Sequence, residues 1–298
     1  DSWQRGDRNL YGRYDFAYDG VSKPKLLEYN ADTPTALFET GYFQWVWLED
    51  MLASGRLPAG SDQFNSLHDK LVAGLKNLKG GMPYFLHLTC LAGVEDDLGT
   101  IGYLAECAAQ AKLPHHIIMI EEIGQQDSGV FVDENGKPID TLFKLYPWEW
   151  LLQDEFGKSI ARSKTQLIEP AWKMLLSNKG LLAFLHNRYP SHPNLLPAFF
   201  EDDPRTASLQ SAHVRKPLLS REGANITLVQ GGVTTQTDGP YAGPAIVQAD
   251  AHMPSFDGEY PVVGAWVVAS EPAGMCIRED DGAITTDKAR FIPHYILP

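Results

Sequence analysis

RYDFAY at residues 13–18 and PKLLEYN at residues 24–30 decide the fold of this 298-residue chain. Polar and apolar residues alternate in the first run, and the second is another short extended run. Side chains of a strand alternate between its two faces, so the polar side chains of each run share a face: Arg13 and Asp15 in the first, Glu28 and Asn30 in the second. The two runs therefore predict a β-hairpin on which four polar groups converge.

The oxygen atoms of this hairpin suit a hard divalent cation. Magnesium takes near-octahedral coordination, usually from one or two carboxylates with phosphate oxygens and water completing the shell. Asp15, Glu28 and Asn30 could supply the protein's share. Arg13 would then face a phosphoryl group, where a guanidinium stabilises charge in the transition state. The alternative is a solvated strand face with arginine–carboxylate pairs, which spacing alone favours.

A second segment, KPLLSREGAN at residues 216–225, has the composition of a phosphate-binding turn. It lies between two predicted strands, and Gly223 lets its backbone approach a ligand closely. Consecutive amides can form an anion-binding nest, to which Lys216 and Arg221 add positive charge. The P-loop and dinucleotide-binding fingerprints are absent, and an ordinary charged hairpin turn is the competing interpretation. Together with the hairpin, the segment points to ATP and magnesium.

Six stretches in order make the chain resemble the synthetase domain of glutathionylspermidine synthase and its stand-alone relatives. They are YGRYDF (11–16), LEYNADTPT (27–35), EPAWKMLLSNK (169–179), PSHPNLLP (190–197), KPLLSREGAN (216–225) and ARFIPH (289–294). The resemblance implies an α+β ATP-grasp fold of the permuted, glutathione-synthetase-like kind, with a small α/β substrate lobe. It also implies a ligase that joins a carboxylate to an amine through an acyl phosphate, with ATP and Mg²⁺ as cofactors.

The same resemblance implies roles for individual residues. The magnesium ligands would be Asp15, Glu28 and Asn30, and the catalytic cations Arg13 and Arg221. The ATP-binding residues would be Lys179, Lys216, Arg221, Gly223 and Gln248, with the loop at 221–223 closing over the phosphates and Gln248 meeting the adenine. The peptide or amine substrate would be bound by Thr33, Glu95, Asp96 and Arg290. Lys173 is an alternative to Lys179, which matches the family better.

The spacing of apolar residues predicts the remaining elements. Helices are expected at 38–52, 64–78, 98–111, 142–156 and 170–185, and buried strands at 83–89 and 117–120. An Asn-Gly turn predicts a hairpin within 130–137, and the chain from 216 onward reads mainly as strands. We expect one synthetase unit over 1–298, in which 35–125 form the substrate lobe and 1–34 with 126–298 the nucleotide- and metal-binding lobes.

Composition narrows the classes of protein. The formal net charge of −13, without a basic stripe, disfavours a nucleic-acid binder. No apolar run reaches the roughly eighteen residues of a membrane helix, and the three cysteines are expected to be reduced thiols. These features predict a cytoplasmic protein with small-molecule partners, and they leave its oligomeric state open. Because the chain begins without Met and almost on the hairpin, an N-terminal part of the full protein is expected to be missing.

The sequence thus predicts an ATP- and Mg²⁺-dependent carboxylate–amine ligase. Its acid would be glutathione or a similar small peptide, and its acceptor a polyamine or related amine. A nucleotide-dependent regulatory protein that has lost ligation is one alternative, against which the intact set of predicted cations and metal ligands argues. A peptide- or polyamine-binding protein without ATP is another, and an ATP titration separates it.

Overall fold

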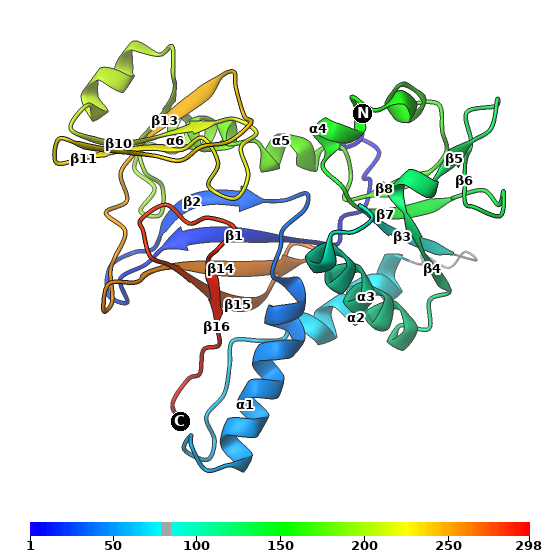
Figure 1. Ribbon diagram of the computed structural model, residues 1–298, viewed down its shortest axis with the longest axis horizontal. Helices are drawn as coiled ribbons and strands as arrows, with labels where there is room; N and C mark the ends of the chain where they lie inside the picture. The colour runs from blue at the N-terminus through cyan, green and yellow to red at the C-terminus, as the bar shows by residue number, and fades with distance from the viewer. Residues whose placement is uncertain (79–84) are drawn as a thin grey trace.

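The predicted hairpin forms the edge of an antiparallel sheet. The computed structural model describes residues 1–78 and 85–298, in which this sheet has the order β16-β15-β14-β1-β2 (Figure 1). Its strands are β1 (Tyr11–Ala17), β2 (Lys25–Asn30), β14 (Tyr260–Val268), β15 (Glu271–Asp280) and β16 (Arg290–Ile292). Arg13 lies opposite Asn30, and Asp15 opposite Glu28, so the predicted pairing is confirmed.

A second antiparallel sheet carries the predicted phosphate-binding segment. Its order is β12-β11-β10-β13-β9. The strands are β9 (Ala198–Phe200), β10 (Ala212–Pro217), β11 (Thr227–Gln230), β12 (Val233–Gln236) and β13 (Ala245–Ala249). Helix α6 (Gly180–Arg188) packs between this sheet and β2, because Leu182 shares a core with Ile246 and Leu26. The expected strand, turn and strand around residues 216–225 are confirmed.

The third sheet is parallel and has the order β4-β3-β7-β8. Its strands are β3 (Leu86–Cys90), β4 (His115–Met119), β7 (Thr141–Leu145) and β8 (Gln166–Ile168). All residues of β3 and β7 are buried, as is usual for central strands of parallel sheets. Helix α3 (Glu95–Gln110) packs on it, helix α2 (Leu67–Leu78) packs against α3 and β14, and Leu75, Leu104 and Phe143 join Trp266 of β14 in one core. A short ladder joins β5 (Gly124–Gln125) to β6 (Phe131–Val132), and the expected hairpin within 130–137 is closed by an antiparallel bridge between Val132 and Pro138.

The helix predicted at 142–156 is wrong. Residues 142–145 belong to β7, and the helical parts are α4 (Trp148–Leu151) and the start of a 3₁₀ helix, Glu155–Ser159. The misreading arises because Leu142, Phe143 and Leu145 are all buried, so this short run has no period that separates strand from helix. The run forms a strand because it pairs with both β3 and β8.

Other predicted elements need smaller corrections. The helix at 170–185 is two helices, α5 (Lys173–Ser177) and α6, because Asn178 is extended and its side chain accepts a hydrogen bond from the Gly180 amide at 2.8 Å. The strand at 117–120 is the sheet edge β4, where only Ile118 is buried. The first two residues of the strand predicted at 83–89 lie outside the described residues. The predicted substrate lobe over 35–125 stays a proposal, and β7 and β8 of its sheet lie beyond that boundary.

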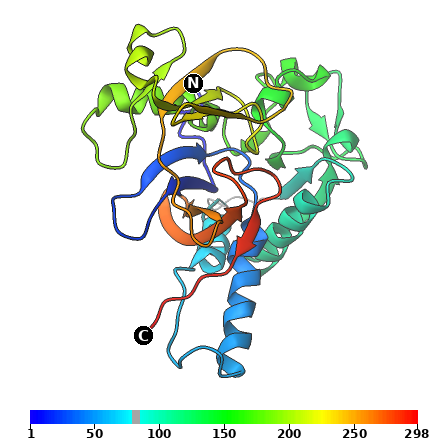
Figure 2. The same cartoon turned by 60° about the vertical axis from the view of Figure 1, so that its left-hand side comes forward.

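The helix predicted at 38–52 projects from the body beside the C-terminus (Figures 1 and 2). It begins with a π-helical turn, Glu39–Phe43, and continues as α1 (Gln44–Ala53). Buried polar groups attach its base: Gln63 Nε2 donates to the carbonyls of Gln44 and His294, at 2.8 and 2.9 Å. His294 Nε2 accepts from the Phe64 amide at 3.1 Å, so its proton is on Nδ1, 3.0 Å from Gln44 Oε1.

We expect the buried His294 to make the folded protein less stable in acid. Burial lowers the pKa of His294 from 6.5 to about 4. Between these values the unfolded chain takes up a proton that the folded chain does not, so the free energy of unfolding should fall by about 2 kcal/mol from pH 7.5 to pH 5. Urea unfolding at both pH values measures the change, and His294→Gln should lack this component. An equal pH dependence in both proteins would contradict the prediction.

Two simpler features accompany the fold. Within residues 1–78 and 85–298, no helix is both long and apolar enough to cross a bilayer. The three cysteines, Cys90, Cys107 and Cys276, are buried and free, which agrees with the expectation of reduced thiols.

Candidate functional site

A cavity of about 490 Å³ lies where the three sheets meet. Its wall comes from β1 and β2, from β10 and β13, and from the segments that follow β3 and β7. Most predicted site residues line it: Arg13, Asp15, Glu28, Asn30, Thr33, Asp96, Lys179, Lys216, Arg221, Gly223 and Gln248. Residues separated by more than 200 positions in the chain thus share one wall.

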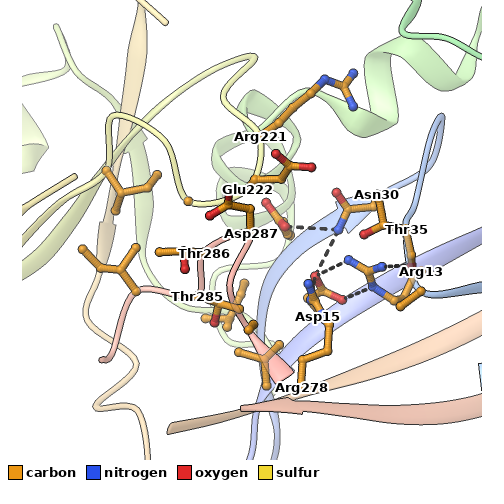
Figure 3. Close-up of a pocket in the computed structure, with 18 of the residues that line it drawn as sticks. Arg13, Asp15, Asn30, Thr35, Arg221, Glu222, Arg278, Thr285, Thr286 and Asp287 are labelled. Carbon is orange, nitrogen blue, oxygen red and sulfur yellow. Dashed lines mark hydrogen bonds and ion pairs between the residues drawn. The ribbon is translucent and has the colours of Figure 1, made fainter. Parts of the chain in front are cut away.

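The polar face of the hairpin forms one side of this cavity. Asn30 Nδ2 lies between the two carboxylates and donates to Asp15 Oδ2 and Glu28 Oε1, at 3.1 Å each (Figure 3). Side chains Arg13 and Asp15 are each only 3% exposed, so this part of the face is not solvated, although the arginine–carboxylate pair that the alternative expects is present. The other face of the hairpin is apolar, where the rings of Tyr14 and Tyr29 stack with centroids 3.8 Å apart.

This donor set fits the chemistry of magnesium bound together with a nucleotide. In the described part of the chain, no three His, Cys, Asp or Glu side chains are grouped to hold a metal. A nucleotide-bound Mg²⁺ needs only one or two carboxylates, since phosphate oxygens and water complete its shell. Asp15 and Glu28 face each other across the hairpin with the Asn30 amide between them.

Arg13 is held rigidly beside these carboxylates. Its Nε and Nη2 donate to the two oxygens of Asp15 at 2.6 and 3.0 Å, and Nη1 donates to the Thr35 carbonyl. The guanidinium carbon lies 5.6 Å from the centre of the Trp266 ring. Burial lowers the pKa of Arg13, but its charge attraction to and hydrogen bonds with Asp15, together with the charge of Glu28, outweigh burial and raise the pKa above its ordinary value. The side chain is therefore a fixed positive charge at the cavity wall.

Arg278 is a cavity residue that the sequence reasoning missed. Its Nη2 donates to Asp15 Oδ2 at 2.6 Å, so Asp15 lies between two guanidinium groups (Figure 3). Its Nε is buried without a partner among the described residues. Arg278 lies on β15, separated from Asp15 by β14 and by 263 positions in sequence. Alternation along β15 could have indicated its face, but no local motif marks it.

Two lysines supply positive charge on the side of Glu28. Lys179 Nζ lies 2.9 Å from Glu28 Oε2, and it donates to the Ser220 carbonyl at 2.6 Å. Burial raises the pKa of Glu28, but Lys179, Lys216 and Asn30 together lower it by more, so the pKa of this carboxyl lies well below its ordinary value. Burial lowers the pKa of Lys216 to about 8. The alternative lysine, Lys173, lies outside the cavity in a buried pair with Glu169 at 2.6 Å.

Gln248 supports Lys216 with its side chain. Its Oε1 accepts from Lys216 Nζ at 2.8 Å, and its Nε2 donates to the Leu26 carbonyl at 3.1 Å. The side chain is only 1% exposed. Both ends of the amide are therefore used within the protein, and its contact with adenine stays a prediction.

The loop after β10 closes another side of the cavity. Gly223 has a φ of +69°, and a Cβ built there would lie 2.3 Å from the Thr285 carbonyl oxygen. Only glycine fits this close approach without displacing the backbone. Arg221 is at the edge of the cavity, where it contacts Glu149 and Thr33.

Another part of the cavity wall is acidic. Asp96 and its neighbour Asp97, which the sequence reasoning did not single out, both line the cavity from the first turn of α3. Burial, with Asp96 and Glu222 nearby, raises the pKa of Asp97 to about 6. The structure does not bring Glu95 to the cavity. Nor does it bring Arg290, which is exposed and paired with Asp281 at 2.8 Å and with Glu259.

Comparison with known proteins identifies the family. A family model described as glutathionylspermidine synthase preATP-grasp matches residues 1–297. The chain belongs to this family. A Haemophilus influenzae protein, provisionally named an acid–amine ligase, is 44% identical over all of this chain and 77% of its own length. Trypanothione synthetase of Crithidia fasciculata and the bifunctional glutathionylspermidine synthetase/amidase of Escherichia coli are 25% and 24% identical, over 95% and 99% of the chain. The chain spans about half the length of these two relatives.

Solved structures agree on the fold. A glutathione synthetase-like effector from Globodera pallida superposes with a TM-score of 0.59 over 97% of this chain and 76% of its own, at 10% identity. A protein titled as a γ-glutamylcysteine synthetase from Methylobacillus flagellatus gives 0.61 over 98% and 82%, at 11% identity. The predictions of an enzyme of this family and of an α+β, glutathione-synthetase-like fold are therefore confirmed.

Proposed function

We propose that this member of the glutathionylspermidine synthase family is an ATP- and Mg²⁺-dependent ligase that joins the carboxylate of a small peptide to an amine. One observation carries the proposal: a single cavity holds two facing carboxylates and, beside them, four cationic side chains. The carboxylates are Asp15 and Glu28, and the cations Arg13, Arg278, Lys179 and Lys216. A nucleotide with its divalent cation needs both kinds of group, because the cation pairs with carboxylates and the phosphates pair with cationic side chains when water is excluded.

Each group has a defined task in this proposal. Asp15, Glu28 and Asn30 would hold Mg²⁺, which neutralises phosphate charge when it is bound. Lys179 and Lys216 would bind the phosphates, and Arg13 would stabilise the charge that develops as phosphoryl transfers to the substrate carboxylate. The resulting acyl phosphate is then open to attack by an amine, and the loop at 221–223 would keep water from it.

The acidic wall favours a cationic acceptor. Asp96 and Asp97 lie on it beside Glu222, and in the described residues no lysine or arginine forms an ion pair with them. A protonated amine placed there would meet two or three carboxylates. This arrangement supports a polyamine or related amine, as the sequence predicts, while the cytoplasmic location and the roles of Glu95 and Arg290 remain predictions.

The direct test is ADP release from ATP and Mg²⁺ by the full-length protein. Glutathione and other small peptides are screened against spermidine and related amines, and product masses are recorded. ADP that forms only when one acid and one amine are both present, with the condensed mass, supports the ligase. ATP binding without turnover on any pair favours a nucleotide-bound regulator, and absence of ATP binding overturns the proposal.

Glu28→Gln is expected to abolish nearly all turnover while the fold remains intact. The change removes one ligand charge from the magnesium site and leaves Lys179 without its carboxylate partner, at a partly exposed position. Kinetics at several Mg²⁺ concentrations, with melting temperature as the check on folding, measure it. Glu201→Gln, which breaks the exposed Arg215–Glu201 pair on the second sheet, is the matched control. Unchanged turnover in Glu28→Gln would rule out the metal assignment.

A further inference from the structure

Arg221 points away from the place where phosphates would bind. Its Nε and Nη2 donate to Glu149 Oε1 at 3.1 and 2.5 Å, and Nη1 donates to Thr33 Oγ1 at 2.7 Å. In Figure 3 the side chain extends away from Arg13, Asp15 and Asn30. Its guanidinium therefore lies apart from the polar face of the hairpin.

These contacts are strong enough to set the direction of the side chain. The side chains of Arg221 and Glu149 are only 24% and 11% exposed. Hydrogen bonds between charged groups are about twice as strong as neutral ones, and partial burial reduces their screening by salt. Release of Arg221 towards a phosphate would therefore need a competing anion or the loss of the Glu149 charge.

The backbone around Arg221 is anchored on both sides. The Ser220 carbonyl accepts from Lys179 Nζ at 2.6 Å, and Gly223 packs against the Thr285 carbonyl. The Gly223 carbonyl also accepts from Thr237 Oγ1 at 2.5 Å. A change of partner by Arg221 can therefore take place by rotation of its side chain, while the loop keeps its contact with the phosphate-binding lysine.

We propose that Glu149, with Thr33, is a positioning residue that holds Arg221 away from the phosphates until a ligand displaces it. Glu149 and the phosphates then compete for one guanidinium. This inference rests on the proposed function, because it takes phosphate as the second partner of Arg221. Since Thr33 is also a predicted substrate residue, binding of the acid next to it would release Arg221 at the moment when the phosphoryl group is needed. The arrangement would limit ATP hydrolysis in the absence of the acid.

Competition between Glu149 and the phosphates for Arg221 predicts the direction in which nucleotide affinity changes when Glu149 is replaced. The apparent dissociation constant equals the intrinsic one divided by the fraction of molecules whose Arg221 is free, so weakening the Glu149 contact should tighten nucleotide binding. We expect Glu149→Gln to bind the Mg²⁺ complex of adenylyl imidodiphosphate about tenfold more tightly than the unchanged protein. Thr33→Val should act in the same direction and less strongly. A residue with a purely structural role would not raise affinity when it is replaced.

Isothermal titration calorimetry with this analogue tests the inference, with melting temperatures to confirm folding. Glu201→Gln is the matched control, because it also breaks an Arg–Glu pair, that with Arg215, but Glu201 does not line the cavity. Its affinity should stay unchanged. Combined with Arg221→Ala, the Glu149→Gln replacement should have no further effect, because the competing guanidinium is gone.

The outcomes separate the inference from the proposed function. Unchanged or weaker binding by Glu149→Gln, with normal binding by the unchanged protein, overturns the role of Glu149 only. Equal tightening in Glu201→Gln also overturns it, because the effect would then be one of net charge. Tightening that persists in the absence of Arg221 overturns it as well. Failure of the unchanged protein to bind the analogue overturns the proposed function and this inference together.

Discussion

Arg13→Ala is expected to lower the turnover number by about two to three orders of magnitude while the affinity for MgATP changes little. A guanidinium has five N–H donors, and hydrogen bonds to Asp15 and Thr35 use three of those of Arg13. The remaining donors are available to a phosphoryl group at the cavity wall. Their direction is set by the partners of Arg13, so their contribution is greatest when charge develops during transfer.

The fold should tolerate this replacement. Asp15 keeps its hydrogen bond from Arg278 at 2.6 Å and that from Asn30 at 3.1 Å, so its carboxylate is not left without partners. Steady-state kinetics on the acid and amine identified by ADP release, together with calorimetric titration of the nucleotide, measure the two effects separately. Arg13→Lys keeps the charge without the planar fork and should fall between the two proteins. If the loss appeared only in nucleotide affinity, Arg13 would be a ground-state binder.

Lys144→Met is expected to cost about 3–5 kcal/mol of the free energy of unfolding, the largest stability effect we predict. Lys144 Nζ lies 2.6 Å from Asp32 Oδ1, and the two side chains are 0% and 1% exposed. Asp32 Oδ2 also accepts from the Trp148 amide at 2.9 Å. The replacement leaves a carboxylate buried without its cation, a state far costlier than the loss of one contact.

Urea unfolding measures this cost, and a double variant tests its origin. Asp32→Asn combined with Lys144→Met removes both charges, so it should recover much of the lost stability. Arg215→Met is the control, because the Arg215–Glu201 pair is 33% and 46% exposed and should contribute within about 1 kcal/mol. If the double variant were less stable than Lys144→Met, the stranded charge would not be the cause. The pair also joins the turn after β2 to β7 and α4, so it supports Thr33 and Glu149 together.

The family resemblance and the hairpin picked out residues most of which the structure brings to one cavity, while their roles stay predictions. The alternation of Arg13, Asp15, Glu28 and Asn30 is a local property, because side-chain direction in a strand follows from backbone geometry. A two-strand hairpin therefore needs only its register to bring them together, and that register is the observed one. Lys216 and Gly223 were found in the same way, from a strand and the turn that follows it.

Predictions from the sequence were wrong or missing where residues distant in the chain determine the secondary structure or the partner of a side chain. Residues 142–145 form a strand because they pair with β3 on one side and β8 on the other. Their amino-acid sequence alone is equally compatible with a buried helix. Arg278 pairs with Asp15 across two strand positions in the sheet order, and nothing near it in sequence indicates a partner 263 residues away. Glu149 of α4 shows the same limit, because its partner Arg221 lies 72 positions away in the loop after β10.

The sequence by itself determined the polar face of the hairpin, the strand and glycine turn at residues 216–225 and, through its matching stretches, the family. Both motifs consist of residues close in the chain, whose relative directions depend on local backbone geometry. The tertiary structure alone decided which charges became partners: Asp15 with Arg278, Asp32 with Lys144, and Arg221 with Glu149. Electrostatic attraction acts between any opposite charges, so the packing of the sheets, which sets distance and burial, selects the pairs that form.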